Sequence, residues 1–170
     1  MPPILCLSNG ISNEQAIARV AGKEKVIYGT VTTAVGRRGP GDIVLERLRG
    51  VGIAKGHPLV ASLFVAFENA LLNPRLFDDA MEMKWSKLLT NLIANPTSAI
   101  LDMTAAEILA NRKLYKLEVE MLRECLAVMK AQGIEVVDLP GTPVRALAQV
   151  PELTLGLSML FVTCAAGGGG

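Results

Sequence analysis

The fold of this 170-residue chain is decided by residues 4–33, which read ILCLSNGISNEQAIARVAGKEKVIYGTVTT. The opening apolar run is short and continuous, which is typical of a buried strand. The turn signal Asn9-Gly10 follows, then a helical pattern that ends at Gly22. Residues 26–33 are rich in β-branched side chains and predict a second strand. The order strand, helix, strand predicts a βαβ unit and therefore a parallel sheet.

Local signals set the limits of this helix and of the segments after it. Ser12 and Gln15 predict a capping box at the helix start. The apolar face of the helix is expected to hold Ala16, Ile17 and Val20. Residues 43–53 predict a solvated strand or hairpin. Residues 58–72 predict a helix that residues 73–74, Asn-Pro, bring to an end.

From residue 78 onward the pattern is helical throughout. Residues 80–94 are strongly periodic, and Asn95-Pro96 is expected to close that helix. The predicted fold class is therefore α/β followed by all-α. The shift in composition near residue 78 divides the chain into two predicted domains, 1–77 and 78–170.

The second predicted domain continues with a long helical pattern. Thr104 and Glu107 predict another capping box, and a helical run extends from there to Gln132 with a break near Asn111. Gly133 is expected to end this helix. The buried face is expected to hold Leu114, Leu117, Met121, Cys125, Val128 and Met129.

Composition excludes several classes of function. Lys and Arg total 17 against 16 Asp and Glu, so no large basic face exists to bind nucleic acid or an anionic membrane. Three cysteines are too few for a disulfide framework and fit a reducing, cytoplasmic compartment. Because His57 is the single histidine, we assign no metal site. The apolar run 153–166 is shorter than the roughly 20 residues of a membrane span, which favours a buried core segment.

The most informative helix is residues 81–95. At about 100° per residue, Lys84, Lys87, Asn91 and Asn95 share one stripe beside an apolar face. A partly desolvated lysine has a lowered pKa and gives up its proton more easily near neutral pH. Asparagine offers both a donor and an acceptor. The pattern fits the wall of a binding cleft, and it also fits an ordinary amphipathic helix with solvated lysines.

Four motifs follow one another along the chain. They are Ser8-Asn9-Gly10 with Asn13-Glu14; Gly29 to Ala34 with Gly39-Pro40-Gly41; Trp85-Ser86-Lys87-Leu88 with Asn91 and Asn95-Pro96-Thr97; and Leu139-Pro140-Gly141. In this order and spacing they resemble the ketopantoate reductase (2-dehydropantoate 2-reductase) family. The resemblance implies the later part of a Rossmann-like dinucleotide-binding domain in 1–77. It also implies the first part of a helical substrate and dimerisation domain in 78–170.

The same resemblance implies an activity and a set of site residues. The activity is NADP-dependent reduction of 2-dehydropantoate, a small-molecule 2-oxo acid, to pantoate in pantothenate biosynthesis. Lys87 would be the catalytic residue beside the developing alkoxide. Asn91, Asn95 and Asn9 would bind the substrate, while Asn9, Gly10 and Val35 would contact the cofactor. Helical domains of such dehydrogenases often pair, and the exposed apolar segments permit a homodimer.

The sequence departs from the family pattern in several places. The G-x-G-x-x-G turn that cradles a pyrophosphate is absent, and residues 50–56 have the wrong spacing for it. A later serine and glutamate of the family find no counterpart, because Glu107 and Glu118 lie too early. Ala105 stands where the family has another asparagine, which leaves the substrate open. We therefore expect an internal piece of a longer protein, with little or no activity by itself.

Two other functions stay open at this stage. One is a non-catalytic helical interaction domain that binds a partner through the apolar segment 153–166. The other is a related dehydrogenase that acts on a different 2-oxo acid. An upstream glycine-rich turn and a downstream helix with serine and glutamate would favour an enzyme over an interaction domain. A panel of substrates would separate the two enzymes.

Overall fold

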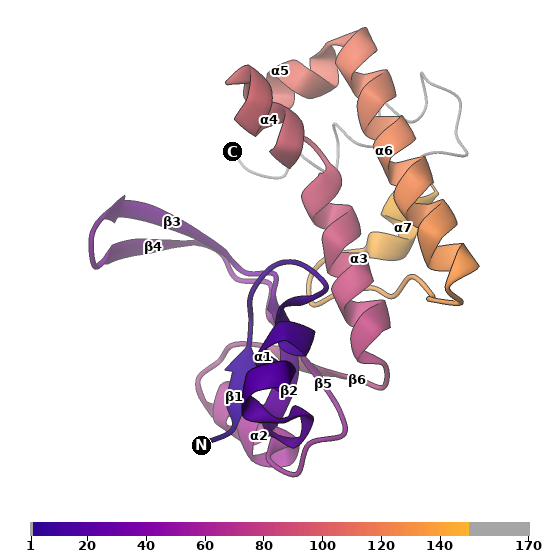
Figure 1. The fold of residues 1–170 in the computed structure, drawn as a ribbon. Coiled ribbons are helices and arrows are strands. Elements are labelled where there is room, and N and C mark those ends of the chain that lie inside the picture. The colour runs from indigo at the N-terminus through magenta and orange to yellow at the C-terminus, as the bar shows by residue number, and fades with distance from the viewer. Residues whose placement is uncertain (1, 150–170) are drawn as a thin grey trace. The chain divides into compact units, whose positions relative to one another are not determined.

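The computed structural model describes residues 2–149, in two compact units (Figure 1). The first unit runs to Lys87 and includes the later segment 137–143; the second holds 88–136 and the described residues from 144 onward. The predicted boundary near residue 78 stays a prediction. The apolar run 153–166 and Cys164 lie outside the described residues.

The first unit is built on a four-stranded mixed sheet in the order β1-β2-β5-β6. The strands are β1 (Ile4–Cys6), β2 (Val26–Val31), β5 (Val51–Ala54) and β6 (Pro74–Phe77). β1 pairs with β2 in parallel, as the βαβ pattern predicts, whereas β2 pairs with β5 antiparallel. The sequence did not predict β6. This strand begins at Pro74, a position where a strand tolerates proline. Asn73-Pro74 therefore begins a strand as well as following the helix before it.

Helix α1 (Asn13–Ala21) connects β1 to β2, and a short 3-10 helix η1 (Lys23–Lys25) follows it. The predicted capping box is wrong, because the Ser12 side chain makes no capping hydrogen bond. The predicted apolar face is also wrong in part. Glu14 is buried while Val20 is 83% exposed, since a buried lysine draws the Glu14 carboxylate inward.

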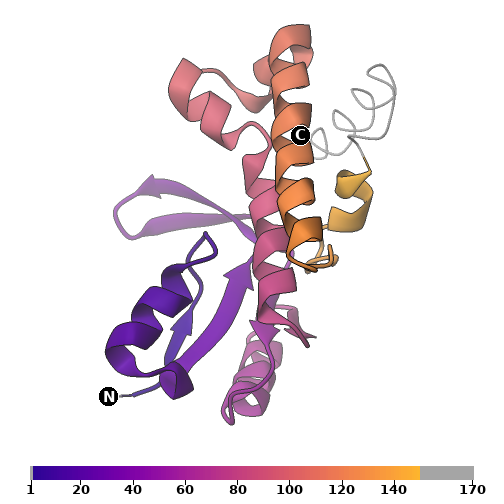
Figure 2. The ribbon, with the colours of Figure 1, turned by 45° about the vertical axis from the view of Figure 1, so that its right-hand side comes forward.

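Helix α2 (Val60–Asn69) packs on β5 and β6, and Figure 2 shows α1 and α2 on either side of the strands. Ile27, Val51, Ile53 and Val60 form the core under α2. At Gly52 a Cβ atom would lie 2.9 Å from Met83 Sδ, so this glycine lets the next helix approach the sheet closely. Residues 50–56 therefore serve strand packing. The solvated strand or hairpin predicted at 43–53 is right only for its first part. The hairpin is β3 (Ala34–Gly39) with β4 (Asp42–Arg47), which Figure 1 shows projecting from the sheet, whereas Val51–Ala54 is the buried strand β5.

The helical region begins with α3 (Ala80–Leu92), whose residues to Lys87 belong to the first unit. The later helices are α4 (Asn95–Leu101), α5 (Ala105–Ala110), α6 (Arg112–Ala131) and α7 (Val144–Ala148). The Thr104–Glu107 capping box and the break at Asn111 are confirmed. Asn95-Pro96 starts α4 as well as following α3, because proline is tolerated in the first helical turn.

The buried face of α6 differs from the predicted one. Its buried residues are Tyr115, Glu118, Val119, Leu122, Cys125 and Met129, whereas Leu117 and Val128 are exposed. The actual stripe includes an acidic residue, which a search for apolar periodicity passes over. Cys6 and Cys125 are buried free thiols. Among the described helices, none combines the length and apolarity that crossing a membrane requires.

Candidate functional site

The loop after β1 holds the first predicted site residues. Asn9 is exposed, and Gly10 has a φ of +99°, a conformation that residues with a side chain rarely adopt. The Asn13 side chain donates from Nδ2 to the Asn9 carbonyl oxygen over 2.6 Å. Because the loop leaves the carboxyl end of a parallel strand, it lies where open α/β sheets bind their ligands.

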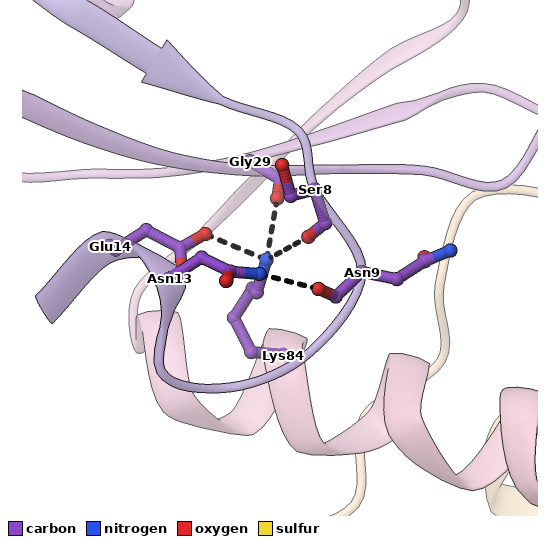
Figure 3. Close-up of polar contacts among 6 residues, drawn as sticks. All are labelled: Ser8, Asn9, Asn13, Glu14, Gly29 and Lys84. Carbon is purple, nitrogen blue, oxygen red and sulfur yellow. Dashed lines mark hydrogen bonds and ion pairs between the residues drawn. The ribbon is translucent and has the colours of Figure 1, made fainter. Parts of the chain in front are cut away.

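Lys84 of α3 lies buried beside this loop with 2% of its surface exposed (Figure 3). Its Nζ donates to the carbonyl oxygens of Ser8 at 2.7 Å and Gly29 at 3.3 Å. It also forms an ion pair with Glu14 Oε1 at 2.7 Å, and Glu14 is fully buried. The interpretation of Lys84 as part of a cleft wall is therefore wrong. A buried carboxylate and two carbonyl oxygens hold its ammonium group inside the unit.

Lys87, the predicted catalytic residue, follows Lys84 by three residues on α3 and is half-buried. Burial lowers the pKa of its ammonium group, and the positive charge of Arg49 lowers the pKa further. Arg49 is held in place through Nη1, which donates to the Thr32 carbonyl oxygen over 3.1 Å. Such a lysine releases its proton at a lower pH than an exposed lysine does, which suits proton donation.

The segment 137–143, which belongs to the first unit, forms hydrogen bonds to residues close to Lys87 and Arg49 in the sequence. The Val137 backbone N–H donates to Ser86 Oγ over 2.9 Å, directly before Lys87. Thr32 Oγ1 donates to the Pro140 carbonyl oxygen over 2.7 Å. Thr32 is the residue whose backbone carbonyl oxygen holds Arg49. The Leu139-Pro140-Gly141 motif is therefore a structural connection that belongs to the compact unit of the sheet.

The predicted asparagines divide between two helices. Asn91 is half-buried on α3, four residues after Lys87 and so on the same side of that helix. Asn95 is exposed and is the first residue of α4, beyond a break in the helix at Ala94 with a φ of +60°. The predicted unbroken stripe from Lys87 to Asn95 therefore holds for Asn91 and ends before Asn95.

Glu118 of α6 supports this helix break in the second unit. Its side chain is 3% exposed, and its Oε2 accepts a hydrogen bond from the Ala94 backbone N–H over 2.7 Å. Its Oε1 accepts from the Thr97 hydroxyl group. Glu118 thus caps the start of α4, directly at Asn95. The sequence did contain a signal for this role: Glu118 lies one helical turn from Tyr115 and from Leu122, so an acidic residue falls on the face that is buried.

Val35, a predicted cofactor contact, lies on β3 of the projecting hairpin, opposite Leu45 of β4. Its side chain is exposed. Within the first unit, Lys84 contacts the Ser8 carbonyl oxygen directly before Asn9, and Lys84 and Lys87 lie on the same helix. Contact of Val35 with a cofactor stays a prediction.

Two sequence models of one family match this chain. The model described as "Ketopantoate reductase PanE/ApbA" matches residues 2–56, and "Ketopantoate reductase PanE/ApbA C terminal" matches residues 79–154. The chain belongs to the ketopantoate reductase family. The resemblance of the four motifs is thereby confirmed.

The curated relatives are named 2-dehydropantoate 2-reductase. The one from Streptococcus pyogenes serotype M6 is 26% identical over 163 residues, which are 88% of this chain and 52% of the relative. The one from Pyrococcus horikoshii is 30% identical over 156 residues, 89% of this chain and 50% of the relative. The chain thus spans about half the length of these curated ketopantoate reductases.

Solved structures confirm the predicted fold class. The 2-dehydropantoate 2-reductase of Geobacter metallireducens GS-15 is 25% identical, with a TM-score of 0.71 over 94% of this chain and 56% of that one. D-mandelate dehydrogenase, solved with NADH, is 24% identical, with a TM-score of 0.68 over 88% of this chain and 53% of that one. The second likeness concerns the fold alone.

Proposed function

We propose that this chain carries part of the active site of a 2-dehydropantoate 2-reductase. The observation that carries the proposal is Lys87, which is half-buried and has a lowered pKa because of burial and of Arg49. Reduction of a ketone produces a developing alkoxide, which a nearby cation stabilises and can protonate. Lys87 provides this group, and the names of the curated relatives support 2-dehydropantoate as the substrate.

Asn91 and Asn95 bind polar groups of the substrate in this proposal. Asn91 shares the side of α3 with Lys87, and Asn95 opens α4 at the junction that Glu118 holds. Amide side chains donate to carboxylate and accept from hydroxyl groups, which matches a 2-oxo acid with a hydroxyl group. Asn9 approaches the same substrate from the loop after β1.

A nicotinamide cofactor supplies the hydride when it is bound. The positive φ of Gly10 keeps the turn free of a side chain at the carboxyl end of β1, which fits close approach of such a group. Membership of the ketopantoate reductase family supports a dinucleotide cofactor of the NAD(P) type. The choice of NADP, with Asn9, Gly10 and Val35 as its contacts, is part of the proposal. No residue of this chain is assigned to the pyrophosphate.

We further propose that these 170 residues alone turn over little 2-dehydropantoate, because they contain no G-x-G-x-x-G turn. The test follows the absorbance of NADPH with 2-dehydropantoate and the purified chain. Robust turnover would contradict this part of the proposal. A panel of other 2-oxo acids in the same assay addresses the alternative substrate that Ala105 leaves open.

Lys87→Ala, made in the longest reading frame that contains this chain, tests the mechanism. Turnover is expected to fall about 10²- to 10⁴-fold, as for loss of a general acid, with an unchanged circular dichroism spectrum. Lys116→Ala, which removes an exposed lysine from α6, is the matched control and should retain full turnover. Equal activity of the Lys87 variant and the control would remove Lys87 from the catalytic role.

Three features of the proposal rest on the sequence and the family. They are a place in pantothenate biosynthesis, a cytoplasmic location and a homodimer. Sedimentation of the purified chain tests the homodimer directly. A monomer at all accessible concentrations would contradict it for this chain.

A further inference from the structure

We propose that Lys84 is a positioning residue that fastens the Asn9–Gly10 turn to the helix carrying Lys87. This inference rests on the proposed function, because the turn and Lys87 belong to one active site only under that function. Lys84 itself touches neither substrate nor cofactor. It acts through the backbone at the end of β1.

Three separate segments converge on the Lys84 ammonium group (Figure 3). Ser8 contributes its carbonyl oxygen from the end of β1, Gly29 its carbonyl oxygen from β2, and Glu14 its carboxylate from α1. An ammonium group has three N–H donors. The two carbonyl oxygens accept hydrogen bonds and the carboxylate forms an ion pair, so the lysine joins α3 to both strands of the parallel pair and to the helix between them.

The carboxylate in this cluster is less well satisfied than the lysine. Among the described residues, none donates a hydrogen bond to either carboxylate oxygen of Glu14, although both atoms are buried, and the Lys84 contact to Oε1 is an ion pair. An apolar pair in the place of Glu14 and Lys84 would fill the same space without the cost of removing two charges from water. What an apolar pair cannot provide is the bonds to the Ser8 and Gly29 carbonyl oxygens. Those bonds are the specific contribution of Lys84.

The Ser8 bond acts directly next to Asn9. The Asn9 backbone is held on the other side by Asn13, whose Nδ2 donates to the Asn9 carbonyl oxygen. Figure 3 shows the Asn9 side chain pointing away from the Lys84 cluster, so the backbone is fastened while the amide stays exposed. The turn thus presents Asn9 from a fixed backbone.

The helix relates this turn to Lys87. Lys84 and Lys87 are separated by three residues of α3, a rise of about 4.5 Å along a rigid element. Any movement of the turn away from Lys84 is therefore also a movement of Asn9 relative to Lys87. A displacement of about 1 Å between reacting groups can lower a rate about 100-fold, so this link matters for the proposed reaction.

The test compares the purified chain with three variants. Lys84→Met removes the cation, Lys84→Met with Glu14→Leu removes both charges, and Lys55→Met is the matched control. Lys55 pairs with Asp78 in the same unit at 2.6 Å, with 51% and 90% of the two side chains exposed. The readout is the backbone 15N order parameter of Asn9 and Gly10, with strand β2 as the internal reference.

The parent and the Lys55→Met control should show order parameters near 0.85 in the turn, as for rigid backbone. In the double variant, the value in the turn should fall below about 0.6 while β2 stays rigid. The double variant carries the test even if Lys84→Met alone fails to fold. A double variant whose turn stays as rigid as the parent overturns the proposal, and so does a parent whose turn is already mobile.

Substrate binding separates this proposal from the proposed function. In the longest reading frame that contains this chain, titration with 2-dehydropantoate is expected to shift the Asn9 side-chain amide signal of the parent and to require an at least tenfold higher concentration in the double variant, about 1.4 kcal/mol. Absence of any shift in the parent contradicts the proposed function, while the order parameters still decide the role of Lys84. Equal binding by parent and double variant contradicts the role of Lys84 alone.

Discussion

Each unit contains a buried carboxylate next to a predicted substrate-binding asparagine, and the two carboxylates are satisfied differently. In the first unit, Glu14 pairs with the buried cation Lys84 beside Asn9. In the second unit, Glu118 accepts hydrogen bonds from a backbone N–H and a hydroxyl group beside Asn95. The Glu14 carboxylate is stabilised by a second charge from a distant segment. The Glu118 carboxylate is stabilised by an N–H group at a helix start, which has no partner within the helix.

The same difference extends to the helix starts themselves. Helix α1 begins without a side-chain cap at Ser12. In the second unit, Glu118 supports α4, Thr104 and Glu107 cap α5, and Asn111 caps α6. The comparison indicates that the buried carboxylate of the first unit relies on one long-range ion pair. In the second unit the polar support at helix starts is shared between the long-range contact of Glu118 and the local caps of α5 and α6.

Lys84→Met should produce the largest effect on stability. It leaves a fully buried Glu14 carboxylate without its cation, so the free energy of unfolding should fall by about 3–5 kcal/mol. Adding Glu14→Leu should restore most of this loss, because an apolar pair needs no desolvation of charge. Urea unfolding measures both values. A loss below about 1 kcal/mol in the single variant would show that Glu14 depends on its cation no more than Glu118 depends on its hydrogen-bond donors.

Glu118→Gln should have a smaller effect. The amide oxygen can still accept one of the two hydrogen bonds, but the other partner faces an N–H₂ group and the charge is lost. We expect a decrease of about 1–3 kcal/mol in the free energy of unfolding. Glu120→Gln, at an exposed pair with Arg123, is the control and should change stability by less than about 1 kcal/mol. Equal effects in both variants would contradict the role of Glu118.

Thr104→Ala and Ser12→Ala test the contrast at the helix starts. Thr104 caps α5 through both halves of a capping box, so its loss should lower the free energy of unfolding by about 1 kcal/mol. Ser12 has no capping hydrogen bond, and its replacement should have no measurable effect. Thermal unfolding of the two variants checks this difference. A larger effect at Ser12 than at Thr104 would reverse the comparison.

The smallest effect concerns the pH dependence of Glu107. Hydrogen bonds from the Thr104 backbone and then from its hydroxyl group lower the pKa of this exposed carboxyl group. Because the folded pKa lies below the unfolded one, the stabilisation is present above the ordinary glutamate pKa and disappears as pH falls through the folded value. Titration by NMR should show a higher Glu107 pKa in Thr104→Ala than in the parent. An unchanged pKa would mean that the hydroxyl group makes no contribution.

Much of the fold could be predicted because its signals are local. The Asn9-Gly10 turn, the capping box at Thr104 and the break at Asn111 each depend on residues a few positions apart. Helix start signals at Asn95-Pro96 were present too, but the asparagine-proline pair also ends helices, so the sequence indicated the end of α3 and missed the start of α4. Strand β6 was missed for the same reason at Asn73-Pro74.

The candidate site was predictable only in part. The order of motifs identified Lys87, Asn91, Asn95 and Asn9, and each stays a proposal for function. The sequence placed Lys84 on the same polar stripe as Lys87, since helical periodicity assigns both to one side. Nothing local distinguishes the lysine that is half-buried from the one that is almost completely buried.

The sequence by itself determined the opening strand, helix and strand, the family and the candidate residues of the active site, because these follow from short-range pattern and motif spacing. Only the tertiary structure decided which charges are buried. Lys84 meets the Ser8 carbonyl oxygen across 76 residues of chain, and Glu118 meets Ala94 across 24. Burial of a charge depends on partners that folding brings together from distant positions, and no local pattern specifies them.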